Sequence, residues 1–488
     1  MIDEDLTQIV ESIKSKKFSC QEVVDIYLSR AEKLNPELGA YITLNSSIKR
    51  HAIWVDKAIA KGEDLGRLAG APLAIKDLLC TQGIKTTAGS RILENFVPPY
   101  SATVVDKLSV AGALVLGKTN LDEFAMGSSN ETSAFSHCRN PWDRECVPGG
   151  SSGGSAVAVA AQMAVAAIGT DTGGSIRQPA SFCGVVGVKP TYGRVSRYGI
   201  VAFASSLDQA GPMTKSVRDA ALMLEVISGR DPKDGTTSGH RVEPFAADLN
   251  PSVKGLCVGL PKQYFGEGVD DEVRQVVEKA IEVLKSMGAE VKEISIPLTS
   301  MAIPIYYLIA TSEASSNLAR YDGVRYGYRA DFSKKPPKDL EEFYSRTRSE
   351  GFGTEVKRRI ILGTYALSSG YYDAYYKKAS QIRRLLRQQL IDVFAECDVI
   401  LSPVAPTPAF KIGGRVQDPL LMYLNDVFTT STNLAGTPGM SVPGGFSKKG
   451  LPIGVQVMTG PFQEQKMLNV ALALEEAVDM KGKVPGVL

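Results

Sequence analysis

The chain has 488 residues, of which 44% are hydrophobic and 22% are charged, and this composition is typical of a folded globular protein. It excludes a wholly disordered, collagen-like or coiled-coil chain. The length predicts about two to four domains of about 150 residues each, or one unusually large α/β domain. The 55 basic and 53 acidic residues leave a net charge of only +2, without a basic block that would indicate nucleic-acid binding.

Nothing in the sequence indicates export, membrane insertion or metal binding. Residues 1–17 lack the basic and apolar regions of a secretory signal. The longest apolar stretch, residues 155–168, is shorter than the roughly 20 residues that a membrane span requires. The seven cysteines are scattered and form no Cys-x-x-Cys pair. We therefore expect a soluble cytoplasmic protein without a metal site.

Helical periodicity dominates the first sixty residues. The apolar spacing over residues 6–13 predicts one amphipathic helix. Ser19 and Glu22 form a capping-box pattern at the start of a second helix, and Pro36 is expected to follow the end of that helix.

Strand-like and helical segments alternate along the rest of the chain. Strands are predicted at 72–79, 113–116, 164–169, 185–188, 255–260, 290–296 and 399–401, and helices at 103–110, 155–161, 271–287 and 464–478. The polar segments 231–250 and 329–338 are predicted to be surface loops. This alternation predicts the α/β class, with a sheet that helices cover on both faces.

Residues 112–119, GALVLGKT, match the phosphate-binding pattern GxxxxGK[ST]. A working phosphate loop follows a strand and opens a helix, and its backbone must be free to wrap the phosphates. Here a predicted helix precedes the pattern, and its four interior residues are apolar. We therefore interpret the segment as a buried strand and expect no nucleotide site.

Two glycine- and serine-rich segments carry the strongest functional signal. PGGSSGGSA at 148–156 and GTDTGGSIR at 169–177 are embedded in apolar, regular sequence, unlike flexible linkers. The second segment follows a predicted buried strand. A serine on a tight turn after a strand, with small neighbours that leave backbone amides uncovered, is what a nucleophile and its oxyanion hole require.

Lysine, rather than histidine, is the predicted base. The three histidines lie outside both segments, which argues against a Ser-His-Asp triad. Lys76 has apolar neighbours in the sequence APLAIKDLL, and burial lowers the pKa of an ammonium group. A decrease of about 3 from the ordinary value of about 10.4 would let Lys76 act as a base near neutral pH.

Together, Lys76 and the motifs GGSSGGS and DTGGSIRQPA resemble the amidase signature family, and the resemblance spans nearly the whole chain. It implies an α/β fold consisting of one large α/β/α sandwich around a mixed β-sheet, with N-terminal helices. Residues 66–488 would form the amidase signature domain, and residues 1–65 an N-terminal helical segment packed on it.

The resemblance also implies a Ser-cisSer-Lys triad. In this triad Ser175 is the nucleophile, Lys76 is the base, and Ser151 bridges them after a cis Gly150–Ser151 peptide bond. The oxyanion hole is expected at backbone N–H groups of the turn that holds the nucleophile. These are the groups of Thr172, Gly173 and Gly174.

Further segments resemble a subgroup of the family that releases ammonia from glutamine. They are 124–131, 312–327, 351–364, 367–379 and 422–439. The implied glutamine-binding residues are Gly127, Ser128, Tyr306, Arg359 and Asp426. Arg359 would hold the α-carboxylate and Asp426 the α-ammonium of glutamine, with Arg358 as the alternative to Arg359.

The function implied by this resemblance is the glutaminase half of an ATP-dependent reaction that converts misacylated Glu-tRNA(Gln) to Gln-tRNA(Gln). The chain would form a heterotrimer with B and C subunits, and tRNA would bind mainly to the partner. ATP and Mg²⁺ would act in the partner, so no cofactor is expected in this chain. Two alternatives are a stand-alone amidase that acts on other amides and a catalytically silent scaffold, which the complete triad disfavours.

Overall fold

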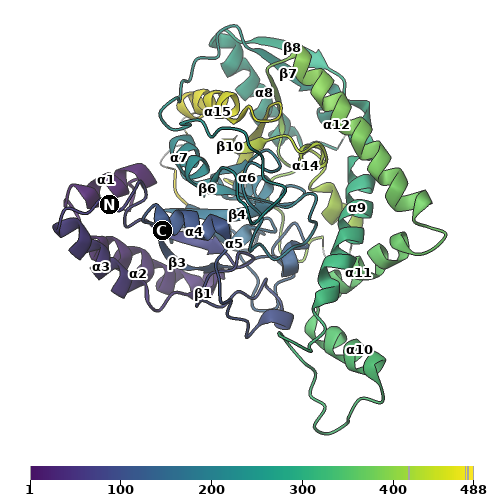
Figure 1. Ribbon diagram of the computed structural model, residues 1–488. Coiled ribbons are helices and arrows are strands. Elements are labelled where there is room, and N and C mark those ends of the chain that lie inside the picture. Colours follow the sequence, from purple (N-terminus) through teal and green to yellow (C-terminus); the bar gives the residue numbers. More distant parts are fainter. Residues whose placement is uncertain (1, 267, 416–417, 479, 481–482, 487–488) are drawn as a thin grey trace.

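The computed structural model describes residues 2–266, 268–415, 418–478, 480 and 483–486. In this part of the chain, eleven strands form a single sheet in the order β1-β3-β2-β4-β6-β5-β10-β11-β9-β7-β8 (Figure 1). The strands are β1 (Tyr41–Leu44), β2 (Pro72–Lys76), β3 (Leu114–Thr119), β4 (Ala166–Asp171), β5 (Val186–Lys189), β6 (Gln209–Thr214), β7 (Cys257–Pro261), β8 (Glu290–Ile294), β9 (Val399–Pro403), β10 (Gly439–Phe446) and β11 (Pro452–Met458).

The α-helices that surround this sheet are α1 (Leu6–Lys14), α2 (Cys20–Leu38), α3 (Ile48–Ala60), α4 (Thr103–Val110), α5 (Gly153–Ala160), α6 (Arg177–Cys183), α7 (Val217–Ile227), α8 (Asp271–Ser286), α9 (Ala302–Asn317), α10 (Leu340–Gly351), α11 (Thr354–Leu367), α12 (Lys378–Glu396), α13 (Pro419–Leu424), α14 (Thr430–Ala435) and α15 (Glu464–Val478). No helix in the described ranges is both long and apolar enough to cross a membrane.

The sheet is mixed and is covered on both faces, which confirms the predicted fold class. Strand β2 runs parallel to β3 and β4, and β7 runs parallel to β8 and β9, whereas the pairs between these groups are antiparallel. Val399 and Leu401 of β9 join a core with α8 and α15, while Ile400 joins a second core with α9 and α12. Alternate residues of a strand point to opposite faces, so helices pack on each side. Figure 1 shows α9, α11 and α12 grouped far from α1–α3.

The N-terminal helices agree with the sequence prediction except at Pro36. Ser19 and Glu22 form the predicted capping box of α2. However, α2 continues through Pro36 and ends at Gly39, whose φ is +60° and whose N–H donates to the Asn35 carbonyl oxygen. The predicted helix end was wrong because a proline in the last turn removes only one hydrogen bond, and the cap is supplied by glycine.

Strand β1 was not predicted. It lies between α2 and α3 and pairs antiparallel with β3, with Tyr41 opposite Thr119. The N-terminal segment therefore contributes a strand to the sheet as well as helices. The division of the chain at residue 65 remains a prediction.

Lys118, from the segment that matches the phosphate-binding pattern, is completely buried at the end of β3. Its Nζ atom lies 3.1 Å from a carboxylate oxygen of Asp77 and donates hydrogen bonds to the Leu79 carbonyl oxygen (2.8 Å) and the Thr86 hydroxyl (2.7 Å). Residues 114–119 form the expected buried strand. The amine is thus engaged inside the fold.

We predict that Lys118→Met lowers the free energy of unfolding by about 3–5 kcal/mol, because it leaves the Asp77 carboxylate buried without its partner. Urea denaturation measures this loss. In the double variant Asp77→Leu/Lys118→Met, where both charges are replaced by apolar side chains, at least half of the loss should be recovered. A single variant within about 1 kcal/mol of the unmodified chain would contradict the structural role assigned to this ion pair.

Candidate active site

Ser175 lies in the turn between β4 and α6, and Asp171 closes this turn. The Asp171 carboxylate accepts hydrogen bonds from the Ile176 N–H (3.1 Å) and the Arg177 Nε–H (3.0 Å), and it forms an ion pair with Arg177 at 3.0 Å. Although burial alone would raise it, the charge of Arg177 lowers the pKa of Asp171 to about 2. A charged and fully buried pair therefore fixes the shape of the turn that carries Ser175.

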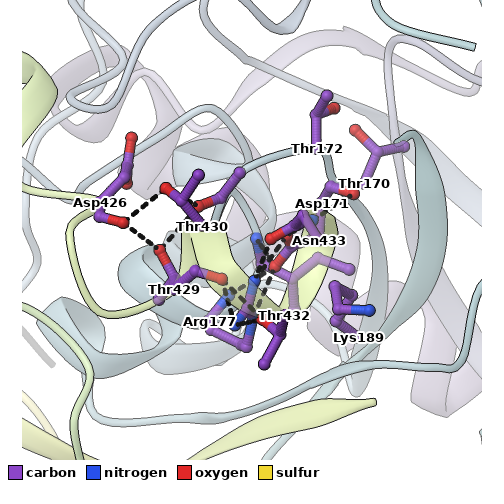
Figure 2. Close-up of polar contacts among 12 residues, drawn as sticks. Thr170, Asp171, Thr172, Arg177, Lys189, Asp426, Thr429, Thr430, Thr432 and Asn433 are labelled. Atoms are coloured by element: carbon purple, nitrogen blue, oxygen red, sulfur yellow. Dashed lines mark hydrogen bonds and ion pairs between the residues drawn. The ribbon is translucent and has the colours of Figure 1, made fainter. Parts of the chain in front are cut away.

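Arg177 also ties this turn to the start of α14, as Figure 2 shows. Its Nη1 atom donates to the Thr429 carbonyl oxygen (3.1 Å), the Thr432 hydroxyl (2.6 Å) and the Gln456 side-chain oxygen (2.6 Å). Its Nη2 atom donates to the side-chain oxygen of Asn433 at 2.6 Å. The guanidinium is thus satisfied by groups that come from three separate parts of the chain.

The turn presents a row of backbone N–H groups without acceptors. Within the described part of the chain, the N–H groups from Thr172 to Ser175 donate no hydrogen bond, although all four residues are buried. Because more than 90% of buried N–H groups in folded proteins are paired, four consecutive exceptions indicate a site for a ligand oxygen. These include the groups of Thr172, Gly173 and Gly174, which the sequence predicted as the oxyanion hole.

Two glycines keep this row of N–H groups uncovered. A Cβ atom at Gly173 would lie 2.7 Å from the ring of Tyr306, so the tyrosine packs directly on the turn. Gly174 has a φ of +144°, which side-chain-bearing residues rarely adopt. The hydroxyl of Thr172 donates to Asp208 at 2.7 Å and holds the start of the turn in place.

Lys76, at the end of β2, is fully buried and contacts three hydroxyl groups. Its Nζ atom lies 2.8 Å from the Ser151 Oγ, 2.9 Å from the Ser152 Oγ and 2.8 Å from the Thr170 Oγ1. The Ser152 hydroxyl donates to the Thr170 carbonyl oxygen, so it can only accept from Lys76. A neutral amine has two N–H donors and one lone pair. If Ser152 and Thr170 accept the two donors, the lone pair faces the Ser151 hydroxyl.

Burial lowers the pKa of Lys76 to about 7, although the carboxylates of Asp122, Asp171 and Asp208 act in the opposite direction. This direction and size agree with the expectation from the apolar sequence around Lys76. Near neutral pH, a substantial fraction of the amine is therefore free to accept a proton.

The structure brings Ser151 and Ser175 onto adjoining turns. The Gly150–Ser151 peptide bond is cis, as the family resemblance implied. The N–H of Ser152 donates to the Ser175 carbonyl oxygen at 3.1 Å, which joins the two turns next to the nucleophile. Among the described residues, the Ser175 hydroxyl itself makes no hydrogen bond, and Ser175 is 7% exposed. Catalytic hydrogen bonds are often long before substrate binds.

Asp426 precedes α14 and faces the same turn. One of its carboxylate oxygens accepts a hydrogen bond from the Ser128 hydroxyl at 2.5 Å. The other oxygen is buried without a hydrogen-bond partner among the described residues, and it would lie 3.1 Å from a Cβ atom at Gly174. Burial raises the pKa of Asp426 to about 7, whereas the Ser128 hydrogen bond lowers it. An unpaired buried carboxylate oxygen indicates a place for a cationic ligand group.

Arg359 of α11 supplies the opposite charge, close enough to Asp426 to lower the pKa of that carboxyl. Its side chain is 3% exposed, and its Nε–H donates to Glu355 at 2.8 Å. The neighbouring Arg358, whose side chain is 42% exposed, pairs with the same carboxylate. Both arginines line a cavity of about 590 Å³ together with Gly127 and Ser128. Burial favours Arg359 over Arg358 as the anion-binding residue.

Sequence reasoning missed several residues that support the site. Ser152 and Thr170 contact Lys76, Asp208 holds Thr172, and the ion pair of Asp171 and Arg177 closes the turn. Most of them lie inside or beside the two motifs that were singled out. Asp171 and Arg177 flank the glycines of GTDTGGSIR, which was a signal that could have revealed the pair. No cluster of His, Cys, Asp and Glu that could hold a metal ion occurs in the described residues.

The fold and the arrangement of the two serine-rich turns define the class as an amide hydrolase. A family model described as Amidase matches residues 22–468. The chain belongs to this amidase family.

The chain is similar over nearly its whole length to proteins of one subgroup. It is 62% identical over 483 residues to the A subunit of the glutamyl-tRNA(Gln) amidotransferase from Bdellovibrio bacteriovorus, and the match covers 99% of both chains. It is 44% identical to the crystal structure of the corresponding protein from Thermotoga maritima, with a TM-score of 0.81 and coverage of 96% and 95%. It is 31% identical to a peptide amidase from Stenotrophomonas maltophilia, with a TM-score of 0.83 and coverage of 99% of both chains.

We predict that Lys76→Arg lowers amide hydrolysis as strongly as Lys76→Ala, by about 10²–10⁴-fold, because a guanidinium stays protonated and cannot accept a proton. In the unmodified chain, kcat/KM should rise as the pH increases through about 7, since Lys76 must lose its proton before it can act. Initial rates measured from pH 5 to 9 test both statements. An Arg variant that keeps more than about a tenth of the activity would indicate that Lys76 acts only through its charge.

Proposed function

We propose that this chain hydrolyses the side-chain amide of glutamine at Ser175 and delivers the ammonia to a partner subunit. The observation that carries the proposal is the pair of opposite buried charges, Arg359 and Asp426, beside the nucleophile turn. A free amino acid carries one carboxylate and one ammonium group, so these residues match its two charges. The similarity to the two amidotransferase proteins, at 62% and 44% identity, supports glutamine as the amino acid.

In the proposed complex, Arg359 binds the α-carboxylate of glutamine, because a guanidinium can donate two parallel hydrogen bonds to a carboxylate. The unpaired oxygen of Asp426 accepts a hydrogen bond from the α-ammonium, and this bound cation favours the ionised form of the carboxyl. Ser128 holds the other oxygen, and Gly127 lines the cavity beside it. Tyr306 covers Gly173 and excludes water from the turn.

Acylation begins with proton transfer from Ser175 through Ser151 to the neutral amine of Lys76. The Ser175 oxygen attacks the amide carbon, and the resulting oxyanion binds to the unpaired N–H groups of the turn. Loss of one such donor typically costs about 3 kcal/mol of transition-state stabilisation. The proton returns through Ser151 to the nitrogen, ammonia leaves, and a glutamyl ester remains on Ser175. Water then hydrolyses this ester to release glutamate.

The ammonia would be used in a partner. By analogy with the relatives, we propose that the chain acts as the glutaminase component of a heterotrimer with B and C subunits, which converts Glu-tRNA(Gln) to Gln-tRNA(Gln). ATP and Mg²⁺ would activate the misacylated tRNA in the partner, which would also bind most of the tRNA. The near-neutral charge of this chain, +2, is consistent with that division of work. The reaction would take place in the cytoplasm.

A stand-alone amidase is the second candidate, because the peptide amidase from Stenotrophomonas maltophilia shares the whole fold at 31% identity. Such an enzyme would act on amides that lack the two charges of a free amino acid. It would then have no use for a buried Asp426 with an unpaired oxygen. The proposed function and this alternative therefore differ in the role of Asp426 and Arg359.

We predict that Ser175→Ala abolishes glutamine hydrolysis in the assembled complex but leaves Gln-tRNA(Gln) formation from added ammonium largely intact. The nucleophile is required only to release ammonia, so ammonium salts bypass it. The measurement compares glutamine-dependent and ammonium-dependent formation of Gln-tRNA(Gln). Loss of both activities would mean that Ser175 is needed for assembly, or that ammonia is not the product that passes to the partner.

We predict that Asp426→Ala and Arg359→Ala each lower kcat/KM for glutamine by about 10²–10⁴-fold, because a polar group of the substrate is then left unpaired in a buried site. Labelling of Ser175 by a small acylating probe should continue in both variants. Arg358→Ala is the matched control and should reduce kcat/KM less than about fivefold, since an exposed ion pair contributes up to about 1 kcal/mol. Unchanged glutamine kinetics in both clamp variants would favour the stand-alone amidase.

A further inference from the structure

The carbonyl group of Gly173 is held from outside its own turn. Its oxygen accepts a hydrogen bond from the Thr429 hydroxyl at 2.6 Å and lies 3.3 Å from the Thr430 hydroxyl. Both threonines are completely buried at the start of α14, and Figure 2 shows them beside Asp426. The Gly173 carbonyl is therefore fixed by a segment about 250 positions further along the chain.

Fixing this carbonyl also fixes one donor of the oxyanion hole. The C=O of Gly173 and the N–H of Gly174 belong to the same planar, trans peptide unit and point in opposite directions. Because the oxygen is drawn toward Thr429, the Gly174 N–H is directed away from α14. A hydrogen bond to the carbonyl also polarises the peptide unit and strengthens its N–H as a donor.

Thr429 uses its hydroxyl for this contact instead of for its own helix. It occupies the N-cap position of α14, where a threonine side chain ordinarily accepts a hydrogen bond from a backbone N–H of the first turn. No such capping bond is present for α14. The side chain is directed at the nucleophile turn, and its oxygen would lie only 2.2 Å from a Cβ atom at Gly174.

The same turn connects Thr429 to Asp426. The Thr430 hydroxyl donates to the Asp426 carbonyl oxygen at 2.6 Å, and the N–H groups of Thr429 and Thr430 donate to that oxygen at 3.2 and 3.0 Å. Arg177 donates to the carbonyl oxygen of Thr429 at 3.1 Å. The segment that carries the unpaired Asp426 oxygen and the hydroxyl that holds Gly173 thus move as one unit.

We propose that Thr429 is a positioning residue that aligns the Gly174 N–H for the oxyanion and links it to the substrate-binding Asp426. This inference rests on the proposed function, since it concerns the same reaction at Ser175. Thr429 does not touch the reacting atoms, so its removal should affect the transition state more than substrate binding.

The test is steady-state glutamine hydrolysis by Thr429→Val and Thr429→Ser in the assembled complex. Thr429→Val keeps the shape of the side chain but removes the donor, and it should lower kcat by about 10- to 100-fold, a part of the 10²–10³-fold loss that follows removal of a whole oxyanion donor. KM for glutamine should stay within about twofold of its original value. Thr429→Ser restores the hydroxyl and should recover kcat to within about threefold.

Thr437→Val is the matched control, because Thr437 is also completely buried but its hydroxyl has no hydrogen-bond partner in the described residues. Its kcat and KM should be unchanged. Glutamate γ-semialdehyde provides a second readout, since its adduct with Ser175 carries a tetrahedral oxygen at the position of the oxyanion. Its inhibition constant should rise in Thr429→Val by the same factor by which kcat falls.

Three results would overturn the inference: kcat of Thr429→Val within twofold of the unmodified complex, failure of Thr429→Ser to recover activity, or a loss that lies wholly in KM. Ser175→Ala, assayed in parallel, separates this inference from the proposed function. If Ser175→Ala is inactive and Thr429→Val is fully active, only the role of Thr429 is wrong. If Ser175→Ala remains active with glutamine, the proposed nucleophile and the role of Thr429 are both wrong.

Discussion

The ion pair of Asp171 and Arg177 is the interaction on which the rest of the site depends. A buried ion pair by itself is weak evidence of stability, because removing two charges from water costs about as much as their attraction returns. Here, hydrogen bonds from separate segments satisfy the remaining donors of the guanidinium. The pair closes the nucleophile turn and anchors it to α14. The reacting end and the substrate-binding end of the site therefore share one rigid frame.

Burial acts on this site in two opposite senses. It lowers the pKa of Lys76 and raises that of Asp426, and both groups then titrate near neutral pH. The two side chains differ in what compensates them. Lys76 is surrounded by hydroxyl groups, which suit a neutral amine, whereas Asp426 keeps one oxygen without a partner among the described residues. A lysine satisfied in its neutral form is suited to accept a proton, and an unsatisfied carboxylate is suited to bind a cation.

The sequence allowed much of the framework to be predicted, because buried strands and capped amphipathic helices leave local patterns. Helices α4 and α15 begin and end at the predicted residues, and Ser19 caps α2 as expected. The missed strands β6 and β10 contain glycine and proline, and α9 has no polar face, so neither shows the expected periodicity. The motifs indicated the nucleophile turn. The contacts of Thr429 with Gly173 could not be predicted, because they join segments that only the folded sheet brings together.

Strand β1 determines what can pair with this side of the sheet. Its pairing with β3 occupies backbone groups that would otherwise form an open edge next to β2, the strand that ends at Lys76. An uncovered edge is a template on which a second chain can add a strand. A chain shortened to begin after residue 65 would lose this protection, and self-association through β3 would compete with folding. The N-terminal residues thus act as a built-in guard against aggregation.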